Sequence, residues 1–256
     1  MNVQRYFIGK VGISRVNVEN AVRLLDSYAR KGHKAYVCVT NVHMAYIGNR
    51  DQHLCGILNE STLTVPDGMP VVWLAKLHGI KDMEKTSGPD LFRAVCSVSM
   101  DRSYTHYFYG SSPAVLSKMI QNLERKYPGI RILGYDSPPF APIEEYDIEG
   151  LIHRMNTLRP TFLWIGLSAP KQEKLIHIIY DKLDIGICIG VGLAFDYVAG
   201  TVKRAPLWMQ KAGVEWVVRV AQRPENIRRF FRPYSWFLCK LAIGLLGYSV
   251  HRGRQN

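Results

Sequence analysis

Residues 161–192 read TFLWIGLSAPKQEKLIHIIYDKLDIGICIGVG, and this stretch decides the fold. An apolar run at 161–165 predicts a buried strand, and a second run at 185–189 predicts another. The segment between them, up to about residue 182, predicts a helix, and a glycine follows each strand. Strand, helix and strand in this order form the unit from which parallel sheets are built.

The same alternation continues through most of the chain. Short strands are expected within residues 5–17, and longer ones at 35–39, 62–65, 105–109 and 130–135. Helices are expected at 18–30, 42–50, 71–78, 90–100, 113–126 and 144–156. This order predicts an α/β fold, in which a mostly parallel sheet carries helices on both faces. We expect the core to span residues 1–200 and a C-terminal appendage to span residues 201–256.

Polar or glycine-rich loops follow several of the expected strands. In a parallel sheet the carboxyl ends of the strands meet at one edge, and ligands bind there. Asn41, Asp67, Gly110 and Gly190 all fall at this edge. The sequence Pro-Asp-Gly at 66–68 is, by itself, ordinary turn and helix-cap chemistry. Because the other loops gather at the same edge, a functional role for the Asp67 carboxylate and a role in the turn are equal alternatives.

Two further loops at this edge have features of anion-binding turns. Gly190 and Gly192 would let a backbone approach a diphosphate, although the third glycine of a dinucleotide fingerprint is missing. A tight strand–helix turn explains these glycines equally well. Lys171 near a helix start opposes the helix dipole, which suits a residue that serves a bound anion. Gln172 beside it is a candidate to bind a base or a sugar hydroxyl.

We expect neither a metal nor a cofactor. The five cysteines contain no CxxC pair, the eight histidines show no HExxH spacing, and no DxD motif is present. Unpaired thiols favour a reducing compartment, and the N-terminus lacks the apolar segment of a signal peptide, so we expect a cytosolic location for the core. Arg204, in the loop after Asp196, is either a phosphate clamp or a solvated charge.

Most of the net charge of +12 lies in the appendage. From residue 201 onward, eleven Lys and Arg stand against two acidic residues, a charge of +9, whereas residues 1–200 carry +3. An excess of this kind indicates an anionic partner: phosphates, nucleic acid or an anionic lipid surface.

The end of the chain is apolar as well as basic. A helix is expected at 207–220, and residues 236–250 are apolar apart from one lysine, with aromatic residues near both ends. About 15 residues make a helix of roughly 22 Å, too short to cross a bilayer. We therefore expect an interfacial helix on an anionic membrane surface, against the alternative of a helix packed on the core or in an oligomer. Nucleic acid is not expected, because a groove-reading helix would not need so many exposed apolar residues.

Seven sequence blocks occur in a recognisable order. They are Asn41, PDGMPVV at 66–72, TSGPDL at 86–91, GLSAPKQE at 166–173, GVGLAFD at 190–196, RAP at 204–206 and GVEWVVR at 213–219. With these blocks the chain resembles the WecG/TagA/CpsF glycosyltransferases, glycosyltransferase family 26, over nearly its whole length to about residue 232. Members often carry threonine two positions before the asparagine, whereas here Thr40 is adjacent to it.

The resemblance implies the transfer of a sugar from a UDP-sugar to a polyprenyl-diphosphate-linked acceptor, without metal, on a Rossmann-like core. Asp67 would be the general base of an inverting reaction, and arginines of the appendage would bind the diphosphate and the membrane. The enzyme would work at the cytoplasmic face of the bacterial inner membrane. Expected substrate-binding residues are Thr40, Asn41, Gly68, Gly110, Lys171, Gln172, Gly190, Gly192, Asp196, Arg204, Arg219 and Arg223.

Two functions of other classes stay open at this point. The first is a non-catalytic scaffold that binds a nucleotide or a lipid. The second is a nicotinamide-dependent sugar oxidoreductase, which the incomplete glycine fingerprint disfavours. The sequence also leaves open which sugar is transferred and whether the chain forms a homo-oligomer.

Overall fold

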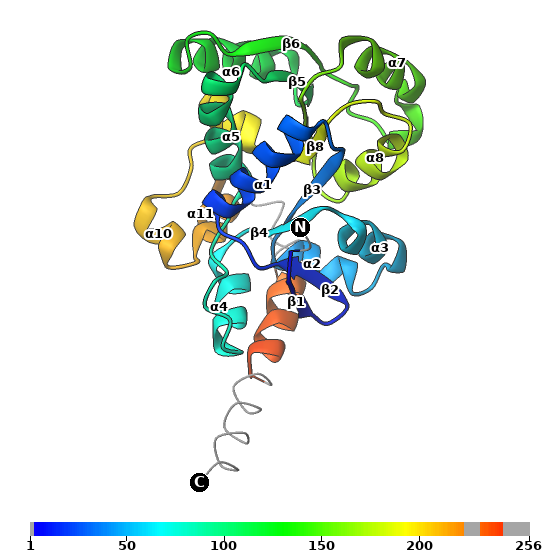
Figure 1. The fold of residues 1–256 in the computed structure, drawn as a ribbon. Helices are drawn as coiled ribbons and strands as arrows, with labels where there is room; N and C mark the ends of the chain where they lie inside the picture. The colour runs from blue at the N-terminus through cyan, green and yellow to red at the C-terminus, as the bar shows by residue number, and fades with distance from the viewer. Residues whose placement is uncertain (1–2, 223–230, 243–256) are drawn as a thin grey trace.

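A parallel six-stranded sheet forms the centre of the computed structural model, which describes residues 3–222 and 231–242 (Figure 1). The strand order is β4-β3-β8-β7-β5-β6, and every pairing within this sheet is parallel. The strands are β3 (Ala35–Thr40), β4 (Leu63–Pro66), β5 (Thr105–Gly110), β6 (Arg131–Asp136), β7 (Phe162–Gly166) and β8 (Ile187–Gly190). The predicted α/β class with a mostly parallel sheet is confirmed.

Helices cover both faces of the sheet, as predicted. One hydrophobic cluster contains side chains of α1 (Val18–Lys31), α5 (Gly88–Arg102), α6 (Pro113–Lys126) and α9 (Ala194–Ala199). The other contains side chains of α2 (Val42–Gly48), α3 (Gln52–Glu60), α4 (Met69–Leu77), α7 (Ile148–Leu158) and α8 (Lys171–Tyr180). Each cluster therefore forms the core on one face of the sheet.

The central strands are apolar throughout because both of their faces are covered. Successive side chains of a strand point to opposite faces. Phe162 and Trp164 of β7 accordingly belong to the cluster of α1, α5, α6 and α9. Leu163 and Ile165, which alternate with them, belong to the other cluster. The continuous apolar run that predicts β7 is thus explained by helices on two sides.

A small antiparallel hairpin, β1 (Arg5–Ile8) and β2 (Val11–Ser14), packs beside β4 at one end of the sheet. The Thr64 amide donates to the Ser14 hydroxyl at 3.0 Å. The Arg5 guanidinium donates to the Leu58 carbonyl and to the Thr64 hydroxyl, each at 3.0 Å. The hairpin therefore shields the edge strand, whose amides would otherwise be open to pairing with another chain.

Two predicted helices have different boundaries in the structure. The helix expected at 144–156 begins at Ile148, after a 3-10 turn, η1 (Ile143–Glu145), because the Asp147 side chain accepts the Gly150 amide at 2.9 Å and caps it there. The helix expected at 207–220 is two helices, α10 (Leu207–Lys211) and α11 (Glu215–Gln222). Between them Gly213 has φ +64, and a Cβ there would lie 2.5 Å from the Trp73 ring.

The described end of the appendage packs on the core. Residues 231–242 are helical, and Phe237 is 3% exposed within the hydrophobic cluster that also contains α2 and α3. The Trp236 ring meets the Tyr46 ring edge-on, with centroids 5.8 Å apart. Phe231 and Leu238 of the same helix are exposed. One side of this segment thus packs on the core, which was the alternative to an interfacial helix. The remainder of the predicted apolar helix, residues 243–250, lies outside the described residues.

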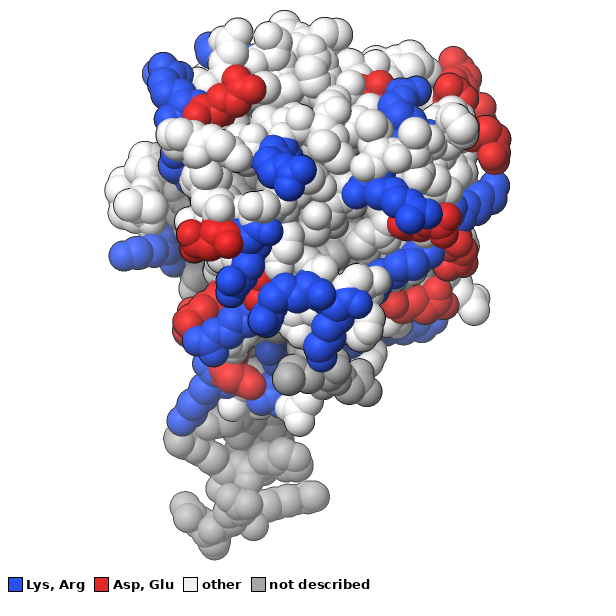
Figure 2. All heavy atoms as spheres, turned by 45° about the horizontal axis from the view of Figure 1, so that its top comes forward, with Lys and Arg blue, Asp and Glu red and all other residues white. Residues whose placement is uncertain are grey.

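The charge of the appendage is only partly described. Lys203, Arg204, Lys211, Arg219, Arg232 and Lys240 are among the described residues, and the other five basic residues are not. Figure 2 shows basic side chains across one face of the molecule, with acidic side chains among them. Among the described residues, no helix combines the length and hydropathy needed to cross a bilayer.

His106 of β5 is the one histidine among the described residues that the sheet buries completely. Its Nδ1 accepts the Trp164 indole N–H at 3.0 Å, and the Phe108 and Phe162 rings stack near it. Burial lowers the pKa of His106 from 6.5 to about 4. A proton on Nδ1 would also remove the acceptor of the Trp164 bond.

We predict that His106 makes the fold sensitive to mild acid. Below pH 6.5 the unfolded chain protonates this histidine while the folded chain does not, so the free energy of unfolding falls as the pH falls. Between about pH 7 and about pH 5 the free energy of unfolding falls by about 2 kcal/mol. Urea unfolding at both pH values should show a smaller loss for His106→Phe than for the wild type. His153→Gln, at an exposed site, should keep the wild-type loss; equal losses in all three proteins would contradict the prediction.

Candidate active site

Asn41 and Asp67 are brought together by the pairing of β3 with β4. The last residues of these strands, Thr40 and Pro66, are partners in the register. The Asp67 amide donates to the Thr40 carbonyl at 2.9 Å, so the pairing continues one residue past the end of β4. The two side chains therefore leave neighbouring strands at the same level, at the edge where the sequence places the site.

The backbone around these residues is set by two helix starts. The Asn41 side-chain oxygen accepts the Met44 amide at 3.1 Å and caps α2, which leaves the two N–H groups of the side-chain amide as donors. Gly68 precedes α4 with φ +102, a conformation that side chains rarely adopt. Pro70 in the first turn suits a helix start. The half-buried Asp67 is thus held between a strand end and a helix that begins two residues later.

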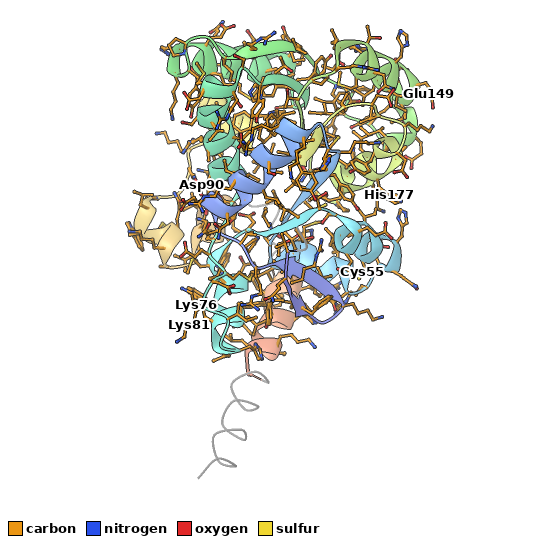
Figure 3. All side chains as sticks on the ribbon, in the orientation of Figure 1. Cys55, Lys76, Lys81, Asp90, Glu149 and His177 are labelled. Carbon is orange, nitrogen blue, oxygen red and sulfur yellow. The ribbon has the colours of Figure 1, made fainter. Side chains whose placement is uncertain are left out.

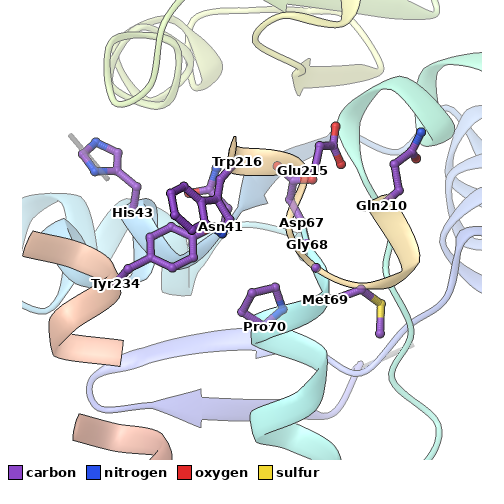
Figure 4. A pocket seen from close by; sticks show the side chains of 11 residues that line it. Asn41, His43, Asp67, Gly68, Met69, Pro70, Gln210, Glu215, Trp216 and Tyr234 are labelled. Carbon is purple, nitrogen blue, oxygen red and sulfur yellow. The ribbon is translucent and has the colours of Figure 1, made fainter. Parts of the chain in front are cut away.

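A pocket that opens to solvent lies over this pair of strand ends. The core lines it with Asn41, His43, Asp67, Gly68, Met69 and Pro70. The appendage lines it with Gln210, Gly213, Glu215, Trp216 and Tyr234. Figure 4 shows the Trp216 and Tyr234 rings next to each other, with the Asp67 and Glu215 carboxylates to one side of them. The pocket is therefore shared between the core and the appendage.

Ion pairs hold the appendage against the core beside this pocket. The Lys85 ammonium donates to the Glu215 carboxylate at 3.2 Å and to the Gln210 amide oxygen at 3.4 Å. Glu215 also lies 3.8 Å from Nε of Arg204. The side chains of Lys85, Arg204 and Glu215 are all less than a sixth exposed. Glu215, at the start of α11, therefore joins two cations that lie far from each other in sequence.

Arg204 reaches from the appendage to the start of α5. It donates to both carboxylate oxygens of Asp90, at 2.6 and 2.8 Å, and to the Ser87 hydroxyl at 3.0 Å. Figure 3 marks Asp90 on the side of the molecule where the appendage lies. Burial alone would lower the pKa of Arg204, but hydrogen bonds to Asp90 and the charges of Asp90, Glu215 and Asp67 raise it. Arg204 therefore stays charged, and its charge interacts with that of Asp67.

The other predicted site residues lie along the same edge but do not line the pocket. Gln172 is buried; its oxygen accepts the Gly192 amide at 2.8 Å, and its nitrogen donates to Glu173 at 2.8 Å. A Cβ at Gly190 would lie 3.0 Å from the Gln172 side chain. Gln172 thus holds the glycine turn in place, and its side-chain oxygen and nitrogen both form hydrogen bonds within the protein.

Lys171 and Gly110 also have structural partners. The Lys171 ammonium donates to the Ala141 carbonyl at 2.6 Å and lies near the Phe140 ring. Gly110 has φ +123, and a Cβ there would lie 2.6 Å from the Gly166 carbonyl oxygen. Both residues therefore fix loops at the far part of the edge.

The remaining predicted residues fall around the pocket or beyond it. Thr40 is fully buried, and its hydroxyl makes no hydrogen bond within the described residues. Asp196 lies in the first turn of α9. Arg219 belongs to α11, the helix of Glu215 and Trp216, but its side chain is not described, and Arg223 lies outside the described residues.

Sequence reasoning missed several residues of the pocket, above all Glu215, Trp216 and Tyr234. The block at 213–219 was visible as a motif, but the side chains that face the pocket depend on the turn at Gly213. Tyr234 has no local signal, because its position depends on a helix that docks from a distant part of the chain. Within the described residues, no three His, Cys, Asp or Glu side chains are placed to hold a metal ion.

Comparison with known proteins gives a family and two named relatives. The model of the glycosyl transferase WecG/TagA/CpsF family matches residues 6–250. An N-acetylglucosaminyldiphosphoundecaprenol N-acetyl-beta-D-mannosaminyltransferase of Bacillus subtilis (strain 168) is 26% identical over 195 residues, 76% of this chain and 74% of the relative. A protein of the same name from Bacillus spizizenii (strain W23) is 26% identical over 206 residues, 80% of this chain and 78% of the relative.

We predict that Asp90→Ala destabilises the fold because it leaves the charge of Arg204 buried without its main partner. Asp90 is about a third exposed, so we expect a loss of about 2 kcal/mol rather than the full cost of a broken buried pair. Urea unfolding measures it. The matched control is Asp82→Ala, which breaks the exposed pair with Arg15 and should cost at most about 0.5 kcal/mol. Similar losses in the two variants would refute the importance of the buried pair.

Proposed function

The chain belongs to the WecG/TagA/CpsF family of glycosyl transferases, and on this premise we propose that it moves a sugar from a UDP-sugar to a polyprenyl-diphosphate-linked saccharide in cell-surface polysaccharide synthesis. The sugar would be of the N-acetylmannosamine, uronic-acid or hexose type. The names of both relatives, N-acetylglucosaminyldiphosphoundecaprenol N-acetyl-beta-D-mannosaminyltransferase, support this choice of substrates. The observation that carries the proposal is the pocket that Asp67 and Asn41 share with the appendage.

Asp67 is the general base of a single displacement in this proposal. Its carboxylate takes the proton of the acceptor hydroxyl while that oxygen attacks the anomeric carbon of the donor. The bond from the anomeric carbon to the β-phosphate oxygen breaks, and UDP leaves with the electron pair. One displacement inverts the anomeric carbon. Glu215, a second carboxylate in the pocket, is engaged by Lys85 and Arg204, which supports a structural role for it rather than a nucleophilic one.

Cations near the pocket would stabilise the charge that develops on UDP. Arg204 supplies positive charge beside Asp67, although both of its terminal nitrogens donate to Asp90 or Ser87. Arg219 belongs to α11, which also carries two pocket residues, and Arg223 follows four positions later in the sequence. We therefore assign the direct diphosphate contacts to Arg219 and Arg223, and a supporting electrostatic role to Arg204.

Transfer requires two substrates at once, so the donor needs contacts beyond the pocket that would hold the acceptor. β8 pairs with β3, so its glycine turn at Gly190 and Gly192 is the next loop along the edge from Asn41. We place the UDP part of the donor beside this turn, which Gln172 holds by accepting the Gly192 amide.

The appendage also supports attachment to the membrane that carries the lipid substrate. Leu207 and Trp208 of α10 and Phe231 of the last described helix are each more than 60% exposed, close in sequence to several Lys and Arg. Exposed apolar side chains with basic neighbours suit the interface of an anionic leaflet. We propose peripheral attachment at the cytoplasmic face of the bacterial inner membrane.

We predict that Asp67→Asn binds both substrates but loses most of its turnover. Removal of a positioned base lowers kcat by about 10²–10⁴-fold, whereas the amide keeps the shape of the carboxylate, so KM should change little. UDP release with a panel of UDP-sugars and a lipid-diphosphate acceptor measures the effect. Asp82→Asn, at an exposed site of the core, is the control and should match the wild type. Wild-type turnover by Asp67→Asn would remove Asp67 from this role, and UDP binding without donor consumption by the wild type would favour the scaffold alternative.

We predict that Leu207→Ser combined with Trp208→Ser weakens binding to anionic vesicles by about tenfold or more, because two large apolar side chains no longer enter the interface. Cosedimentation with vesicles of phosphatidylglycerol measures the bound fraction. Phe140→Ser is the matched control, since Phe140 is fully exposed on a loop of the core. Unchanged sedimentation of the double variant would show that α10 does not contact the membrane.

A further inference from the structure

Trp216 and Tyr234 form an aromatic wall of the pocket that Asp67 also lines. Their ring centroids are 5.2 Å apart, and the planes are tilted by 42°. Trp216 comes from α11 and Tyr234 from the helix at 231–242, so two separate segments of the appendage build the wall. Figure 4 shows both rings beside Asn41, with Asp67 in the same pocket.

Buried contacts with the core fix the position of both rings. Trp216 directly follows Glu215, which binds Lys85 and Arg204. Tyr234 lies one turn before Phe237, which is buried in the core cluster. The two segments are therefore anchored independently, and the wall is formed before any ligand binds.

The chemistry of the pocket matches a sugar ring. The faces of a pyranose carry C–H groups with slight positive charge, which pack against the negative face of an aromatic ring. Its rim carries hydroxyls, which bind carboxylates and amides such as Asp67 and Asn41. An aromatic wall with a few polar groups opposite it provides both kinds of contact in one cavity.

We propose that Trp216 and Tyr234 form the platform for the acceptor sugar, the pyranose that is joined to the lipid-linked diphosphate, and direct its attacking hydroxyl at Asp67. This inference rests on the proposed function, because it takes Asp67 as the base. The acceptor, rather than the donor, carries the hydroxyl that loses its proton, so the acceptor ring must lie in the pocket of Asp67. The wall also belongs to the appendage, the part of the chain proposed to meet the lipid.

The test compares acceptor and donor kinetics in four variants. The substrates are a UDP-sugar and a soluble N-acetylglucosaminyl diphosphate with a short lipid chain. Trp216→Leu and Tyr234→Leu should each lower kcat/KM for the acceptor by about tenfold, or about 1.4 kcal/mol, with the KM of the donor within about twofold of the wild type. Trp216→Phe keeps a ring and should recover most of the loss. Tyr135→Leu, which removes an exposed aromatic ring of the core outside the pocket, should equal the wild type.

Calorimetric titration of the acceptor analogue without donor separates this inference from the proposed function. If the wild type transfers no sugar, the proposed function fails, yet weaker binding of the analogue to Tyr234→Leu still supports the platform. A raised donor KM with an unchanged acceptor KM, or unchanged binding of the analogue, would overturn the platform. Tyr234→Leu leaves the Glu215 contacts intact and decides the question if Trp216→Leu does not fold.

Discussion

The hydrogen bond from the Asp67 amide to the Thr40 carbonyl is the constraint on which the site depends. It extends the parallel pairing of β3 and β4 by one residue and sets Asn41 and Asp67 at the spacing of adjacent strands, about 5 Å. A shift of the register by one residue would turn Asp67 to the opposite face. The buried hydrophobic face of β4 and the hairpin beside it prevent such a shift, so packing far from the pocket fixes the direction of one carboxylate.

A second constraint joins the core to the appendage. Glu215 stands at the start of α11, where the helix dipole favours a negative charge, and binds Lys85 of the core and Arg204 of the appendage. Arg204 in turn binds Asp90. Charges this well buried are costly unless they are paired, so each partner depends on the others. The boundary expected near residue 200 is therefore crossed by ion pairs and by Phe237, and the pocket exists only where both parts meet.

The sequence was sufficient for the elements of the core because their signals are local. Apolar runs predict β7 and β8, and Ser112 with Pro113 marks the start of α6. The sequence was insufficient where the position of a residue depends on a partner that lies far away in the chain. Gln172 has the position of a ligand-binding residue, yet it is buried because the Gly192 amide needs an acceptor. The break at Gly213 depends on Trp73, which lies 140 positions earlier in the chain. Tyr234 reaches the pocket only because Phe237 docks on the core.

Under the proposed function, the residues along the sheet edge are divided between the two substrates. The pocket at the β3–β4 end is lined by two carboxylates, an amide and two aromatic rings, which in the proposed function suit a sugar with a hydroxyl to be activated. The turn after β8 carries Gly190 and Gly192 and is held by Gln172, and in the proposed function it lies beside the UDP part of the donor. A transferase must hold two substrates so that one oxygen meets one carbon, and β3 and β8 are adjacent strands. In the proposed function, the pocket of Asp67 and the glycine turn after β8 therefore lie close enough on one edge to bring the acceptor oxygen and the donor carbon together by positioning.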